Sequence, residues 1–201
     1  MAVADKPSAR EVKRLQTRER LMGAAVAELK RSGVAAADVG AIVTAAGVAH
    51  GTFYFHFPTK EHVLVELERR EEERIAKQLA RFRSAHDDLE STLSETVRLV
   101  MDLERRLGAV LFKDFLALHF SSSRPPVDED AAHPVIVEVA AEIEQAQVRG
   151  RVDPGVHPMN SAVFFLLGLY ALLTTTHERP ARQSMLDDFL TRTLHSLRVA
   201  D

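Results

Sequence analysis

Polar side chains able to bind a nucleic acid lie close together between residues 49 and 60 of this chain. At helical spacing, Val48, Phe53 and Phe57 fall on one side as apolar anchors. The opposite side is then left to a set of small or hydrogen-bonding residues: Ala49, His50, Thr52, Tyr54 and His56. Lys60 follows at the start of the next predicted helix, where the positive helix end favours a phosphate group.

Two short helices must position these side chains. Asp38 is an N-cap for a first helix whose apolar side is Val39, Ile42 and Val43, and Gly47 ends that helix where a left-handed residue is needed. The second helix starts at once and stops at Pro58. Two short helices joined by a tight glycine-containing turn predict a helix-turn-helix, whose second helix can enter the major groove of DNA.

The run from Ala46 to Glu61, AGVAHGTFYFHFPTKE, resembles the signature of TetR-type one-component repressors, and the resemblance in order and spacing extends from Thr17 to Leu67. It implies phosphate contacts for Tyr54 and Lys60. It also implies a phosphate or thymine-methyl contact for Thr52 and a base contact for His50, whose imidazole can donate to or accept from a purine edge. For His56 it implies either support of the helix end or an approach to the DNA backbone.

Other residues of this region are DNA-contact candidates for physical reasons. Gly51 costs about 1 kcal/mol of helix stability relative to alanine, so we expect its purpose to be a close approach of backbone and duplex. Gly40 and Ala41 depart from the resembling family, which often has polar residues there; Thr44 and the N-terminal arm are possible replacements. The first helix adds Thr17 and Arg18, with a solvated helix face as the alternative for its basic residues.

Charge is distributed unevenly along the 201 residues. Residues 1–60 hold nine Lys or Arg and five Asp or Glu, a net charge of +4, whereas the rest holds 17 and 24, a net of −7. The basic end coincides with the predicted helix-turn-helix, as DNA binding requires. With no cysteine, no signal-peptide pattern and no apolar run near the roughly 20 residues of a membrane span, we expect a cytoplasmic protein with no membrane partner.

Catalytic and metal-binding patterns are missing from the sequence. There is no phosphate-binding glycine loop, no Gly-x-Ser-x-Gly elbow and no paired acidic motif, so we expect no enzyme and no cofactor. His50, His56 and His62 are spaced six residues apart, which places neighbours on different helix faces. We therefore predict no metal site.

The remaining chain shows helical periodicity throughout, which predicts an all-α protein of about nine helices. We expect a DNA-binding domain with an N-terminal arm and helix-turn-helix over residues 1–58. A ligand-binding and dimerisation domain follows over residues 59–201 and starts with a connecting helix over 59–82.

The helix predicted after Pro158 is apolar on every side, so it must be covered all round, and a second copy of the chain is the expected cover. Together with the last helix it predicts a four-helix dimer interface. The expected interface residues are Phe165, Gly168, Leu169, Leu172, Leu186, Phe189, Leu190, Leu194 and Leu197.

By analogy with the resembling family, the C-terminal helices also hold a cavity for a small molecule, with plain core packing as the alternative for each residue. The expected lining is Phe82, Met101, Phe112, Phe115, His119, Met159, Asn160, Phe164 and Tyr170. Few fixed charges at these positions favour an apolar or amphipathic ligand.

The sequence thus predicts a homodimeric repressor that binds a palindromic operator in double-stranded DNA and is released by a small effector. Two alternatives remain within DNA binding, an activator and a ligand-independent DNA-binding protein. A third, of a different class, is a helical small-molecule-binding protein with a degenerate DNA reader.

Overall fold

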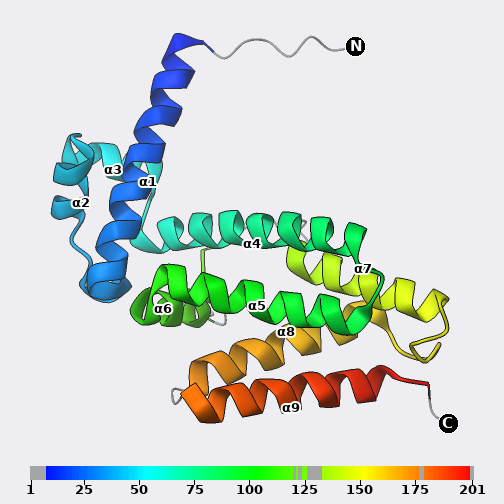
Figure 1. The fold of residues 1–201 in the computed structure, drawn as a ribbon. Helices are drawn as coiled ribbons and strands as arrows, with labels where there is room; N and C mark the ends of the chain where they lie inside the picture. The colour runs from blue at the N-terminus through cyan, green and yellow to red at the C-terminus, as the bar shows by residue number, and fades with distance from the viewer. Residues whose placement is uncertain (1–7, 120, 122–123, 126–132, 177–178, 200–201) are drawn as a thin grey trace. The chain divides into compact units, whose positions relative to one another are not determined.

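The computed structural model describes residues 8–119, 121, 124–125, 133–176 and 179–199. Within these ranges the chain forms nine α-helices and no strand, which confirms the all-α prediction (Figure 1). The helices are α1 (Ala9–Ala36), α2 (Val39–Ala46), α3 (His50–His56), α4 (Lys60–Ala85), α5 (Leu89–Leu107), α6 (Ala109–His119), α7 (Pro134–Val148), α8 (Pro158–Thr175) and α9 (Arg179–Leu197).

The helices group into two compact units that do not follow chain order. The first extends to Leu67 and also includes Leu107–Pro125, so it contains α1 to α3, the start of α4, and α6. The second consists of the rest of α4 with α5, α7, α8 and α9. Helix α4 therefore belongs to both units. The predicted division of function at residue 58 stays a prediction.

Helix α1 is the long support of the first unit. It starts with a capping box in which the Ser8 N–H donates to Glu11 Oε2 at 2.9 Å and the Glu11 N–H donates to Ser8 Oγ at 3.3 Å. Its inward face is apolar and includes the buried Leu21, Ala25 and Leu29. Gly33 interrupts the helix with φ 75° and ψ 167°, a combination that is essentially restricted to glycine.

Helix α6 contacts α1 at this interruption. The Val34 N–H, freed from the helical pattern by the break, donates to Asp114 Oδ2 at 2.7 Å. A Cβ on Gly33 would lie 3.1 Å from the same oxygen and 3.3 Å from a Val110 methyl. The glycine is thus required both by its backbone angles and by the close approach of α6.

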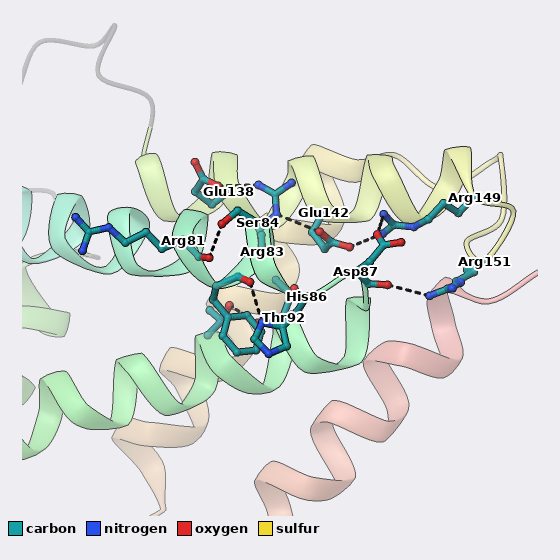
Figure 2. A network of polar contacts seen from close by, with 12 residues as sticks. Arg81, Arg83, Ser84, His86, Asp87, Thr92, Glu138, Glu142, Arg149 and Arg151 are labelled. Carbon is teal, nitrogen blue, oxygen red and sulfur yellow. Dashed lines mark hydrogen bonds and ion pairs between the residues drawn. The ribbon is translucent and has the colours of Figure 1, made fainter.

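An ionic network around one buried carboxylate holds the second unit together at one end (Figure 2). Glu142 of α7, which is 1% exposed, accepts from Arg83 Nε at 3.1 Å and from Arg149 Nη2 at 2.6 Å. Arg83, near the end of α4, also reaches Glu138 at 2.7 Å, and Arg149 pairs with Asp87 in the loop before α5. Because each guanidinium meets two carboxylates, the end of α4 is tied to α7 through several charge-assisted bonds.

Helix α8 packs against α7 on one side and α9 on another. It has 18 residues with a mean hydropathy of 1.4 and, among the described residues, is the one helix that could cross a membrane by length and composition alone. The rings of Phe165 and Phe189 stack at 5.5 Å between α8 and α9. A Cβ on Gly168 would lie 2.7 Å from the Phe189 ring, so Gly168 allows close packing within one chain.

Candidate nucleic-acid interface

Helices α2 and α3 form the predicted helix-turn-helix beside α1 (Figure 1). Asp38 caps α2 by accepting from the Gly40 N–H at 2.8 Å. Gly47 adopts φ 63° and ψ 43°, and the Val48 N–H bonds to the Val43 carbonyl at 3.0 Å, which closes the turn. Both signals had been predicted from local sequence.

Helix α3 has one buried side and one exposed side. Phe53 and the following Phe57 are buried, as predicted, and their rings lie 5.9 Å apart. His50, Gly51 and Tyr54 are exposed, as DNA contacts would need to be. Phe55 is 73% exposed and was not among the predicted contacts. Phe55 lies one helical turn after Gly51, a predicted contact, and this spacing is the sequence signal that could have identified Phe55 as a contact too.

Tyr54 is held by rings while its hydroxyl stays available. Its ring lies 5.3 Å from Phe53 in a T-shaped arrangement and 5.6 Å from His50. Among the described residues no hydrogen bond is made by its hydroxyl, and the side chain is 48% exposed. Tyr54 can therefore offer a phenol to a phosphate without losing an internal contact.

Lys60 is more constrained than expected. Its ammonium donates to the carbonyls of Ala35 and Ala37, both at 3.1 Å, and so satisfies carbonyl groups at the end of α1. An ammonium has three N–H donors, so one is left for a phosphate. The predicted phosphate contact stays a prediction, and a structural role is added to it.

Arg18 turns toward the protein. Its guanidinium lies 3.3 Å from Glu66 and 4.5 Å from the centre of the Phe57 ring, and it donates to the His56 carbonyl at 3.5 Å. These contacts join α1 to the end of α3 and the start of α4. Arg18 thus orients α3, whereas its predicted phosphate contact remains untested.

The surroundings of His56 keep its imidazole neutral near pH 7. Partial burial lowers the pKa of His56, and the positive charges of Arg18 and Arg14 lower it further. A neutral ring can hydrogen-bond to DNA but adds no charge to phosphate binding. This environment favours the support of the helix end over a phosphate contact.

The other predicted contacts lie around α2, α3 and α1. Thr44 is exposed and donates to the Gly40 carbonyl at 2.8 Å, and Ala49 is the exposed N-cap of α3. Thr52 is half-buried. Thr17 is also half-buried, and its hydroxyl donates to the Lys13 carbonyl at 3.0 Å. The structure thus exposes Thr44 and Ala49 more fully than the two other residues.

The predicted effector-lining residues are divided between the two units. Phe112 and Phe115 are buried on α6, with stacked rings 6.4 Å apart, and belong to the first unit. Half-buried Phe82 and Met101 belong to the second unit. The Phe82 ring stacks on His86 at 3.9 Å. Figure 2 shows His86 near the ionic network.

The remaining lining candidates are on or near α8 and at the end of α6. Burial, and then the negative charges of Glu72 and Glu68, raises the pKa of Tyr170, so its phenol stays protonated. Met159, Asn160 and Phe164 are exposed, and Phe164 in particular is 69% exposed on the side of α8 opposite its buried residues. The side chain of His119 lies outside the described part of the structure.

The predicted dimer residues are each buried or half-buried within the single chain. Four are buried: Phe165, Leu169, Leu186 and Leu197. The others are half-buried: Gly168, Leu172, Phe189, Leu190 and Leu194. On a helix, a shift of one residue rotates the position by about 100°, so Phe164 faces outward where Phe165 faces inward. The predicted interface is untested, and the outward side of α8 is the side that a second copy could cover.

The described residues contain no group of three or more His, Cys, Asp or Glu side chains arranged to hold a metal ion.

Comparison with known proteins agrees with this geometry. The family model of bacterial regulatory proteins of the tetR family matches residues 21–67. A candidate TetR-family transcriptional regulator from Mesorhizobium loti is 17% identical, with a TM-score of 0.68 over 93% of this chain and 99% of that chain. The transcriptional regulator FadR from Bacillus subtilis, solved with stearoyl-CoA, is 15% identical, with a TM-score of 0.68 over 90% and 99%.

A gamma-butyrolactone receptor, an ArpA-like protein, is 22% identical, with a TM-score of 0.53 over 92% of this chain and 98% of that chain. No curated protein matches the sequence. Residues 21–67 therefore match the family model of bacterial regulatory proteins of the tetR family, and the whole chain has the fold of the solved TetR-family regulators.

Proposed function

We propose that the protein is a homodimeric transcriptional repressor that binds a palindromic operator and is released from it by a small apolar or amphipathic ligand. The observation that carries this proposal is the exposed side of α3, which presents His50, Gly51 and Tyr54 from a helix-turn-helix braced by α1. The net charge of +4 over residues 1–60 supports a polyanionic partner.

Dimerisation would place two copies of α3 in successive major grooves, about 34 Å apart. The outward side of α8 supports it. Asn160, Phe164, Leu167 and Ala171 recur at helical spacing along this side and are all exposed. An apolar helix side of this kind gains stability when a second copy removes it from water.

Binding of a small effector would release DNA if the ligand prefers the dimer geometry in which the two α3 helices no longer match the grooves. The fold is shared with FadR bound to stearoyl-CoA and with a gamma-butyrolactone receptor, which suggests acyl-CoA thioesters and butyrolactones as first probes. A ligand at about 100 times its Kd should stabilise the folded protein by about 2.7 kcal/mol.

The test of DNA binding is selection of bound sites from random duplexes by the purified protein, with the complex sized by light scattering. An inverted repeat bound by two or four subunits is the expected result. Binding that is equal for all sequences would overturn the operator-specific part of the proposal. A reporter gene placed downstream of the selected site tests whether the protein represses or activates transcription. Repression requires reporter expression to fall when the protein is supplied.

The phosphate contacts are tested on the same operator by affinity at several salt concentrations. Lys60→Ala should reduce the slope of log K against log salt by about 0.9 for each subunit bound, because one cation less displaces counterions. Tyr54→Phe should lower affinity but leave the slope unchanged, because a phenol carries no charge. Lys77→Ala, a change at an exposed lysine in the second unit, is the matched control and should alter neither.

A further inference from the structure

Phe55 is the feature of α3 that the proposed contacts do not use. It is more exposed than any other aromatic side chain in the described part of the chain, at 73%, whereas Phe53 and Phe57 on the same segment are buried. An aromatic ring left in water contributes little to the stability of the fold. Its position on the DNA-facing helix calls for a partner outside the chain.

Open space lies one turn before Phe55. Gly51 occupies this position on the same side of the helix. A Cβ on Gly51 would meet nothing within 4 Å, so the chain itself does not require a glycine there. The missing side chain leaves room for a partner directly beside the ring.

One neighbouring ring restricts Phe55. The His56 ring lies 5.1 Å away and is nearly perpendicular, at 84°, which is a favoured geometry for aromatic pairs. His50 and Tyr54 form a separate ring pair on the same helix. Phe55 is therefore partly preorganised and is flanked by groups that can hydrogen-bond to bases and phosphates.

The major groove presents one apolar group to such an exposed ring, the C5-methyl group of thymine. We propose that Phe55 is a specificity-determining residue that packs against a thymine methyl group and thereby selects a T·A pair at one position of each half-site. This assignment rests on the proposed function, in which α3 enters the major groove. It gives Gly51 a purpose as well, since a side chain there would keep the base edge away from the ring.

The experiment uses the operator obtained by selection and replaces each thymine in turn by uracil, which removes the methyl group alone. One position per half-site should lose about fourfold in affinity, the amount expected for one buried methyl group. Phe55→Ala should bind the natural operator more weakly and show no further loss with uracil at that position. Where a C·G pair replaces the T·A pair, 5-methylcytosine should restore part of the affinity of the full-length wild-type protein.

The controls separate this inference from the function on which it rests. Val148→Ala truncates an exposed apolar side chain at the end of α7, outside α3 and outside the proposed dimer side of α8, and should keep the uracil effect. Because Phe55 is exposed, Phe55→Ala should melt at the wild-type temperature. Two results would refute the Phe55 assignment while leaving DNA binding in place. In the first, the wild type selects an operator but no uracil substitution lowers its affinity. In the second, uracil lowers the affinity of Phe55→Ala as much as that of the wild type. If no sequence is selected, both proposals fail.

Discussion

Replacement of Asp114 tests whether α6 fastens the broken end of α1. In Asp114→Ala the Val34 N–H loses its acceptor at 2.7 Å. A hydrogen bond to a charged group contributes about 1.5–3 kcal/mol, and a backbone donor left without a partner adds its desolvation cost within the same range. We therefore expect the free energy of unfolding to fall by about 2 kcal/mol. For a chain of this length that corresponds to a lowering of Tm by about 4–8 °C.

Asp114→Asn separates the charge from the geometry. The amide oxygen can still accept from Val34, but charge-assisted bonds are roughly twice as strong as neutral ones, so about half of the loss should remain. Urea unfolding followed by circular dichroism gives the three free energies. Hydrogen exchange of the Val34 amide, followed by NMR, reports the bond itself and should be fast in the alanine variant and intermediate in the asparagine variant.

Asp187→Ala, on the exposed side of α9, is the matched control for loss of a carboxylate and should stay within about 0.5 kcal/mol of wild type. Wild-type stability in Asp114→Ala, together with unchanged exchange at Val34, would refute the fastening role. So would equal losses in the alanine and asparagine variants, because they would mean that the packed side chain matters and the charge does not.

Three further results are expected. Burial and two nearby guanidinium groups lower the pKa of His56, so the unfolded chain binds more protons than the folded protein as the pH falls through about 6.5, and the folded protein loses stability. His56→Gln should therefore make Tm less sensitive to pH between about 7.5 and 5.5. An unchanged pH dependence of Tm would count against this environment of His56. Phe164→Arg should convert the proposed dimer into a monomer in sedimentation experiments, whereas Val148→Arg, at another exposed apolar side chain, should leave it intact. Loss of the dimer in both variants would show that the effect is not specific to α8. Glu142→Ala should lower the free energy of unfolding in urea by about 3 kcal/mol, the low end for removal of one partner of a buried pair, because Arg83 and Arg149 are only partly buried and each keeps a second carboxylate. Wild-type stability in this variant would contradict the network.

Local chemistry explains which parts of this structure could be predicted from sequence. Asp38 and Gly47 act on backbone groups a few residues away, so the helix-turn-helix and its boundaries follow from their neighbours alone. The alternation of Phe53 and Phe57 with polar residues likewise indicates which side of α3 is buried. Helical periodicity was also sufficient for the nine helices of the described ranges.

Contacts between distant residues could not be predicted in this way. Asp114 is 80 residues from Val34, and nothing near either residue indicates that they meet. The ammonium of Lys60 reaches carbonyls more than twenty residues earlier, which depends on how α4 leaves the turn after α3. Helix α8 is apolar on all sides. Hydropathy therefore could not distinguish the inward Phe165 from the outward Phe164, because the residues on both sides of the helix have similar hydropathy.

The inclusion of α6 in the first unit matters for anyone who wishes to recombine regulators of this kind. A chimera made by joining residues 1–58 to a foreign effector-binding body would leave the break at Gly33 without the Asp114 carboxylate and the adjoining Val110 methyl. The transplanted reader would then fold with a loosened first helix, whatever operator it carried. A transferable cassette consists of two segments, residues 1–67 and 107–125, and the second must be grafted onto the corresponding helix of the recipient.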